Sequence, residues 1–144
     1  MKSKTNQKKS NKKIKTSKRK TFGTRLSLWG GILAIVSAIA YFVVYKGTAG
    51  NQIDRVFSEV NCGLMLGGGI LALLMELFRF KFGRILPVAC YSVAVASHYV
   101  ESAYPLADAL TGVNFLGGNL TLAIVFAVLF TLSTLMAIAA SFTD

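Results

Sequence analysis

The sequence contains few charged residues for its length. Charged side chains make up 15% of the 144 residues, and the chain has six acidic residues and one histidine. An ordinary soluble domain carries about 25% charged residues. Hydrophobic residues account for 53% of this chain, and its mean hydropathy is +0.55. This composition excludes an ordinary cytosolic enzyme and a nucleic-acid-binding domain.

The sequence also lacks the cysteines and motifs of several functional classes. Its two cysteines, Cys62 and Cys90, are predicted to lie near opposite faces of a membrane, so we expect both to be unpaired. The chain has no Gly-rich phosphate loop, no zinc-protease motif and no Ser-His-Asp signature. One histidine and one glutamate do not complete a tetrahedral zinc site. We therefore expect no enzymatic activity, no cofactor and no metal site.

Basic residues are concentrated at the amino terminus, where residues 1–25 hold 11 of the 16 lysines and arginines. This segment has too little apolar surface to offset the entropy of ordering, so we predict a disordered cytoplasmic tail. No aromatic residue in its first 20 positions could stack on bases, and we expect no nucleic-acid partner. Anionic lipid headgroups attract each basic residue by about 1 kcal/mol and are the expected contact of the tail.

Four apolar stretches follow the tail, and each is long enough to cross a bilayer as a helix. About 20 residues, rising about 1.5 Å each, span a hydrocarbon core of about 30 Å. We predict an all-α integral membrane protein, with residues 26–144 forming a bundle of four transmembrane helices. The predicted spans are 26–45, 56–78, 85–104 and 120–142.

Residues near the ends of the first two spans predict how these helices meet the membrane surface. Tyr41 and Tyr45 lie near the end of the first span and are of the type enriched at membrane interfaces. Asn51 is predicted to cap the second helix. Arg55 and Glu59 are four residues apart, so they are spaced to form an ion pair on this helix.

Similar signals bound the last two spans. Pro87 fits the first turn of the third helix, where its missing N–H needs no partner. Residues 105–119 are predicted to form a connector containing a short helix that Gly112 closes. Asn119 is predicted to cap the fourth helix.

The distribution of basic residues predicts the orientation of the chain. With the amino terminus in the cytoplasm, the basic tail and the turn containing Arg79, Lys81 and Arg84 both lie inside. Lys46 and Arg55 then lie outside. Short cytoplasmic segments of membrane proteins carry an excess of Lys and Arg. We therefore expect a protein of the cell membrane (plasma or bacterial inner membrane) with both termini in the cytoplasm.

Ionisable side chains within a membrane are costly, so each one is a candidate functional residue. Glu76 lies near the cytoplasmic end of the second span, within reach of Arg79 or Arg84. One interpretation is an interfacial ion pair with one of these arginines. The other is a carboxylate coupled to the movement of a proton or a cation.

The third span carries a second candidate polar site for a proton or a ligand. Tyr91, His98, Glu101 and Ser102 share one face of the predicted helix. His98 and Glu101 are three residues apart, so a hydrogen bond or an ion pair between them is geometrically available. The group could instead be a polar pair at the outer interface that anchors this helix against the connector.

Glycines of the second span predict a helix-packing face formed by Gly63, Gly67, Gly68 and Gly69. Small residues let another helix backbone approach closely, with van der Waals contact as the driving force. The approaching helix could belong to the same chain, to a second copy or to another membrane protein.

These observations predict a small multi-pass membrane protein that is a non-enzymatic accessory or scaffold subunit of a membrane assembly. Polar groups near the interfaces and small-residue faces favour this interpretation. One alternative is a small homo-oligomeric transporter or channel that uses Glu76, or His98 with Glu101, at membrane depth. A second alternative is a holin-like protein that perturbs the membrane, which a basic tail and a small size fit.

Overall fold

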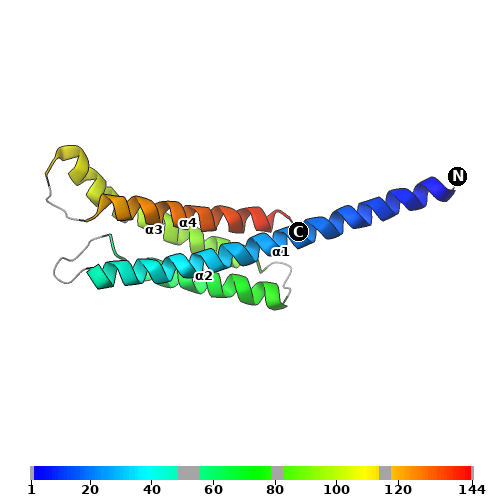
Figure 1. Ribbon diagram of the computed structural model, residues 1–144, viewed down its shortest axis with the longest axis horizontal. Coiled ribbons are helices and arrows are strands. Elements are labelled where there is room, and N and C mark those ends of the chain that lie inside the picture. Colours follow the sequence, from blue (N-terminus) through cyan, green and yellow to red (C-terminus); the bar gives the residue numbers. More distant parts are fainter. Residues whose placement is uncertain (1, 49–55, 79–82, 114–117, 144) are drawn as a thin grey trace.

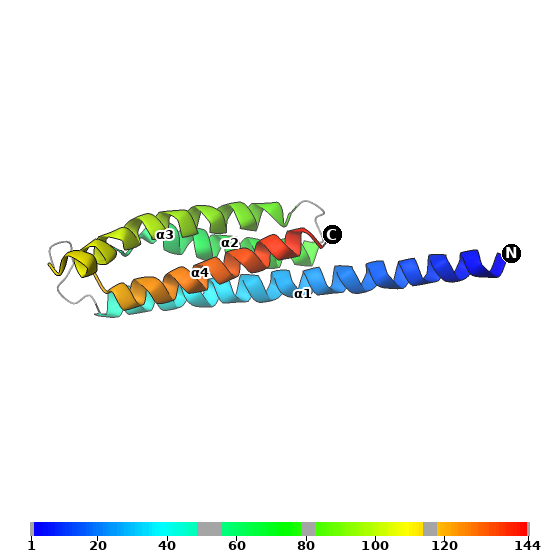
Figure 2. The same ribbon diagram turned by 90° about the horizontal axis from the view of Figure 1, so that it is seen from above.

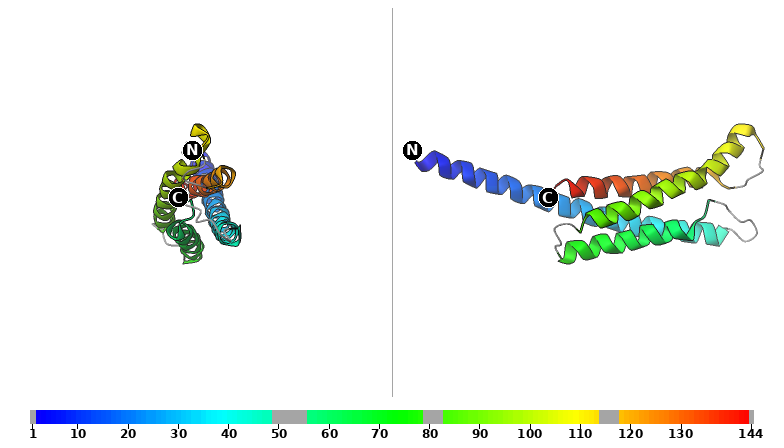
Figure 3. Two further views of the ribbon diagram at one scale, coloured as in Figure 1. Left: turned by 90° about the vertical axis from the view of Figure 1, so that its left-hand side faces the viewer. Right: turned by 180° about the vertical axis from the view of Figure 1, so that it is seen from behind.

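The computed structural model describes residues 2–48, 56–78, 83–113 and 118–143, with the side chains of the first helix described over 22–46. These residues form four helices and no strand: α1 (Lys2–Thr48), α2 (Glu59–Phe78), α3 (Ile85–Thr111) and α4 (Leu120–Ser141). Each helix runs antiparallel to the one before it (Figure 1). α1 and α3 each pack against both α2 and α4, which closes a ring that we call the helical bundle (Figure 3).

Three of these helices are long and apolar enough to cross a membrane. They are the segment Phe22–Lys46 of α1, together with α2 and α4. α3 is less apolar because His98, Glu101 and Asp108 lie within it, although it packs beside α2 and α4 (Figure 2). An all-helical chain with three candidate spans is the part of the predicted fold that the structure confirms.

Small side chains let the helices approach closely. Four alanines are fully buried: Ala34, Ala38, Ala94 and Ala123. A few large side chains fill the remaining interior, namely Tyr41, Met65, Tyr91, His98 and Phe130. Three of these large residues, Tyr41, Tyr91 and His98, carry polar atoms into the core. Buried polar atoms usually need hydrogen-bond partners, so the partners of these side chains bear on how the helices are held together.

Several helix ends confirm the sequence prediction. Asn119 caps α4, because its side-chain oxygen accepts hydrogen bonds from the N–H groups of Thr121 at 3.0 Å and Leu122 at 3.2 Å. Gly112 ends α3 in a left-handed conformation with φ 69°, which glycine adopts without steric cost. Pro87 lies in the first turn of α3, as predicted.

α3 is longer than predicted. The sequence placed the start of a connector at Pro105, but the helix continues through this residue to Thr111. The predicted short helix is therefore the end of α3. Proline removes one hydrogen bond to the preceding turn and its ring crowds the carbonyl there. The end of α3 bends away from the rest of the bundle (Figures 1 and 3).

α2 begins later than predicted. Residues 56–58 are not helical, and the helix starts at Glu59. The predicted cap Asn51 and the predicted ion-pair partner Arg55 lie outside the described residues. Glu59 forms an ion pair with Lys46 at the end of α1, with 3.2 Å between Nζ and Oε1.

The basic tail continues the helix of the first span, where we expected no regular structure. α1 begins at Lys2, and its first part projects beyond the bundle (Figure 1). Lysine, arginine and glutamine favour helices, and the sequence has no glycine or proline before Gly23. The apolar span supplies the helix nucleus, so extending it into the tail carries no second nucleation cost.

Candidate functional site

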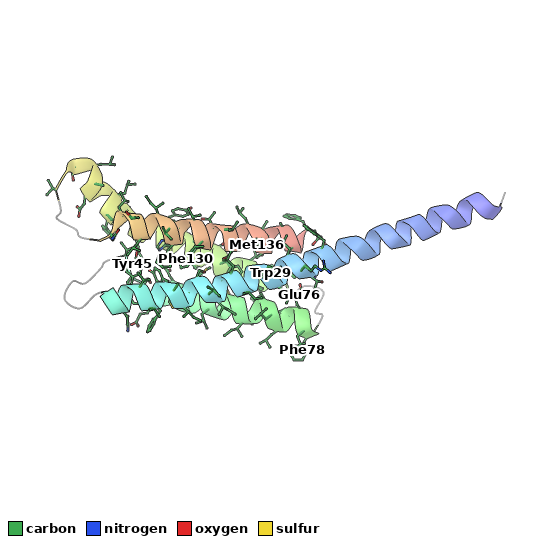
Figure 4. The ribbon with its side chains drawn as sticks, in the orientation of Figure 1. Trp29, Tyr45, Glu76, Phe78, Phe130 and Met136 are labelled. Atoms are coloured by element: carbon green, nitrogen blue, oxygen red, sulfur yellow. The ribbon has the colours of Figure 1, made fainter. Side chains whose placement is uncertain are left out.

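Polar side chains gather at the two ends of the bundle. Figure 4 places Glu76 at the end where the tail of α1 leaves the bundle, and Tyr45 towards the opposite end. We call the contacts around Arg84 the Arg84 cluster, and those around Glu101 the Glu101 cluster. Together they contain two of the four residues that the sequence singled out as candidate polar sites, Glu76 and Glu101.

The centre of the Arg84 cluster is an ion pair that is largely shielded from solvent. Arg84 Nε donates to Glu76 Oε1 at 2.5 Å, and Nη2 donates to Glu76 Oε2 at 3.2 Å. The two side chains are 11% and 9% exposed. A bidentate pair of this kind fixes orientation as well as charge. Of the two predicted partners for Glu76, the structure therefore uses Arg84; Arg79 lies outside the described residues.

The same guanidinium contacts two further helices. Its Nη2 donates to Thr24 Oγ1 on α1 at 3.1 Å, and its Nη1 donates to the carbonyl oxygen of Ala140 on α4 at 3.3 Å. Glu76 belongs to α2, and Arg84 is the residue that precedes α3. One side chain thus joins all four helices at this end of the bundle.

Tyr41 has a structural role that the sequence analysis missed. Its hydroxyl donates to the carbonyl oxygen of Val56 at 2.6 Å and accepts from the N–H of Ser58 at 3.0 Å. Tyr41 is fully buried in the bundle, and Tyr45 is buried as well. Its helical spacing from the buried Ala38 is the signal that could have identified its inward position.

Glu101 connects α3 to the beginning of α2. Its Oε2 accepts a hydrogen bond from Asn61 Nδ2 at 2.7 Å. The side chains of Ser58 and Ser97 also hydrogen-bond to this carboxylate. Asn61 is fully buried, and its Oδ1 has no hydrogen-bond partner within the described parts of the chain. The sequence analysis did not single out Asn61.

His98 connects α3 to α4. Its Nε2 lies 3.1 Å from the carbonyl oxygen of Ala123. A carbonyl oxygen can only accept, so Nε2 carries the hydrogen. Nδ1 is buried without a hydrogen-bond partner in the described segments, and the ring contacts Tyr41 and Phe130 with centroid distances of 5.7 Å and 5.2 Å. The predicted bond between His98 and Glu101 is absent, because the two side chains bind different neighbouring helices.

Tyr91 lies in the contact between α3 and α2. It is fully buried, and none of the described residues is a hydrogen-bond partner of its hydroxyl. Its ring packs against Gly68 so closely that a Cβ at Gly68 would lie 2.7 Å from Tyr91 Cε1. The structure brings Tyr91 and Gly68 together, although the sequence analysis had assigned them to different sites.

The four predicted packing glycines divide into two pairs. A Cβ at Gly69 would lie 2.6 Å from Ile35 Cγ1 and 3.0 Å from the carbonyl oxygen of Gly31, so α1 and α2 approach closely there. Gly68 packs against Tyr91, as described above. Gly63 and Gly67 have no atom of the described chain within 4 Å of such a Cβ. The second pair therefore faces the outside of the bundle.

The described residues contain no group of three or more His, Cys, Asp and Glu side chains that could hold a metal ion. Cys62 and Cys90 are both free thiols, as the sequence predicts. Comparisons of the chain with protein-family models, with curated proteins and with solved structures give no match. The geometry of the two polar clusters is therefore the basis for a functional interpretation.

Proposed function

We propose that this chain is a four-span protein of the cell membrane with both termini in the cytoplasm. The asymmetric distribution of basic residues supports this orientation. The tail and the carboxyl terminus lie at the same end of the bundle (Figure 1), which supports an even number of crossings. α3 is the fourth span in this proposal, because it packs between two helices that are themselves apolar enough to cross.

The proposed function is that of a non-enzymatic accessory or scaffold subunit in a membrane assembly. The observation that carries this proposal is the use of the ionisable side chains inside the bundle. Glu76 binds Arg84, Glu101 binds Asn61 and His98 binds the backbone of α4. These groups connect helices of one chain, which is the role expected of structural contacts rather than of a transport path.

The outward-facing glycines of α2 offer a place where a partner helix can approach. A Cβ added at Gly63 or Gly67 would meet no described atom of another helix within 4 Å. The two glycines are four residues apart and therefore lie on one side of α2, next to exposed apolar side chains such as Val60 and Ile70. A surface with small residues at this spacing favours close helix contact in lipid.

The experiment compares Gly67→Leu with Ile70→Leu in the full-length protein, extracted in a mild detergent. Gly67→Leu adds a large side chain to the outward surface of α2, where the first added atom, Cβ, meets no described atom of another helix within 4 Å. We expect it to reduce the native size of the assembly while the thermal unfolding midpoint of the protein stays close to that of the wild type. Ile70→Leu, a conservative change at an exposed position of the same helix, should leave the assembly intact. An assembly of unchanged size in Gly67→Leu would contradict the proposal.

A second candidate function is a small homo-oligomeric transporter or channel. The observation that favours it is Glu101, whose hydrogen-bond partners among the described residues are all neutral. Such a carboxylate within a membrane can carry an ion or a proton. Ion flux through liposomes containing the purified protein, lost in Glu101→Gln, would support this candidate and contradict a purely structural role.

A further inference from the structure

The Glu101 cluster contains a carboxylate whose charge is not balanced by another side chain in the described part of the protein. Asn61, Ser58 and Ser97 are its hydrogen-bond partners, and all three are neutral. At the same end of the bundle, Lys46 pairs with Glu59. Glu101 is half-buried, and shielding a charge from water without an opposite charge nearby is costly, so the cluster favours a bound cation.

Asn61 supplies a second and independent observation. Its side chain is fully buried, its Nδ2 donates to Glu101 and its Oδ1 has no hydrogen-bond partner among the residues that the structure describes. An unpaired buried oxygen costs about 1–3 kcal/mol, and most buried polar atoms in proteins have a partner. This oxygen belongs to the same amide as the nitrogen that contacts the carboxylate, so it lies next to the unbalanced charge.

We propose that the Glu101 cluster binds a monovalent alkali cation. Its ligands are the Glu101 carboxylate, Asn61 Oδ1 and the hydroxyl oxygens of Ser58 and Ser97. These donors are all oxygens, which suit hard cations rather than zinc or copper. One carboxylate supplies one negative charge, and a monovalent ion balances it without leaving an excess charge in a medium of low dielectric constant.

The site differs from the role that the sequence analysis gave to this region. The expected site combined His98 with Glu101, whereas His98 Nε2 is occupied by the backbone of α4. The proposed ligands come instead from α3 and from the beginning of α2. A bound cation would therefore hold the start of α2 against α3. This cation site goes beyond the proposed scaffold function and does not depend on it.

The test measures thermal unfolding of the full-length protein in detergent micelles at one pH and one ionic strength, with Na⁺ as the probe and choline as the replacement ion. A ligand that binds the folded state raises the unfolding midpoint as its concentration increases. We expect Na⁺ at saturation to raise the midpoint by about 5 °C relative to choline. Equal midpoints in Na⁺ and choline would overturn the proposal, as would a rise with Ca²⁺ but none with Na⁺.

Variants assign the effect to the cluster. Glu101→Gln should abolish the Na⁺-dependent shift, and Ser97→Ala, which removes one hydroxyl ligand, should weaken it even if the first variant folds poorly. Two matched controls should keep the shift: Glu59→Gln, an exposed acid at the same end, and Ser102→Ala, whose hydroxyl binds the carbonyl oxygen of His98 in its own helix. A shift that persists in both Glu101→Gln and Ser97→Ala would overturn the assignment.

Discussion

Single buried polar side chains join the backbone of one helix to another in this protein. The Tyr41 hydroxyl binds the backbone of Val56 and Ser58, just before α2 begins, and His98 binds the backbone of α4. Each group sits among aromatic rings, where water cannot replace a lost partner. Losing such a hydrogen bond leaves a buried polar group unpaired. The free-energy cost of that unpaired group is larger than the net contribution of the bond to stability.

The first prediction concerns Tyr41. Tyr41→Phe keeps the ring but leaves the carbonyl oxygen of Val56 and the N–H of Ser58 without this partner. We expect the free energy of unfolding to fall by about 1–3 kcal/mol, measured by denaturant titration in mixed micelles.

Tyr99→Phe is the control, because the Tyr99 hydroxyl lies at the exposed surface, 2.8 Å from Thr131 Oγ1. Its loss should have a smaller effect. A Tyr41→Phe variant as stable as Tyr99→Phe would show that the buried hydroxyl contributes little to holding α2.

At the scale of the helix, the sequence predicts some features well and others poorly. Helix ends marked by local chemistry, such as Asn119 and Gly112, could be predicted because the cap and its partners lie a few residues apart. The separate partners of His98 and Glu101 could not be predicted. They depend on how each helix is rotated against its neighbours, and adjacent helical residues differ in direction by about 100°.

The second prediction tests the division among the glycines of α2. Gly69→Ala places a methyl group 3.0 Å from the carbonyl oxygen of Gly31, a backbone atom of α1 that cannot rotate away. We expect this substitution to lower the free energy of unfolding by about 1–3 kcal/mol.

Gly67→Ala is the matched control two residues away. Its methyl group meets no atom within 4 Å, and alanine favours a helix by up to about 1 kcal/mol over glycine. Its thermal midpoint should equal or exceed that of the wild type. Equal losses in the two variants would show that α1 and α2 do not approach closely at Gly69.

For the whole molecule, the Arg84 cluster is the contact that joins the most helices. The third prediction is that Arg84→Met lowers the free energy of unfolding by about 3–5 kcal/mol, because Glu76 is then left shielded and unpaired. The double variant Glu76→Gln/Arg84→Met should be less destabilised than the sum of the two single variants. Denaturant titration of the four proteins in mixed micelles measures this coupling.

Lys46→Met provides the comparison with an exposed ion pair. The side chains of Lys46 and Glu59 are 51% and 76% exposed, and such pairs contribute about 0–1 kcal/mol. Additive effects at Glu76 and Arg84, or a loss no larger than that of Lys46→Met, would contradict a joining role for this cluster.

The fourth prediction concerns the orientation of the whole chain. A reporter enzyme that is active only outside the cytoplasm should be inactive when fused after Asp144 and active when inserted beside Gly112 between α3 and α4. The prediction follows from the basic residues at the tail and at the Arg84 end of the bundle. Activity of the fusion after Asp144 would contradict the prediction that both termini lie in the cytoplasm.

The continuous helix of α1 also limits what its amino-terminal charges can reach. The stretch from Lys2 to Phe22 is helical and extends about 30 Å at about 1.5 Å per residue. Electrostatic attraction to a membrane fades over about 8 Å at physiological ionic strength. If the rod stands upright on the proposed bilayer, headgroups meet only its last turns, and the distal part of the helix is held at a fixed distance from the membrane surface.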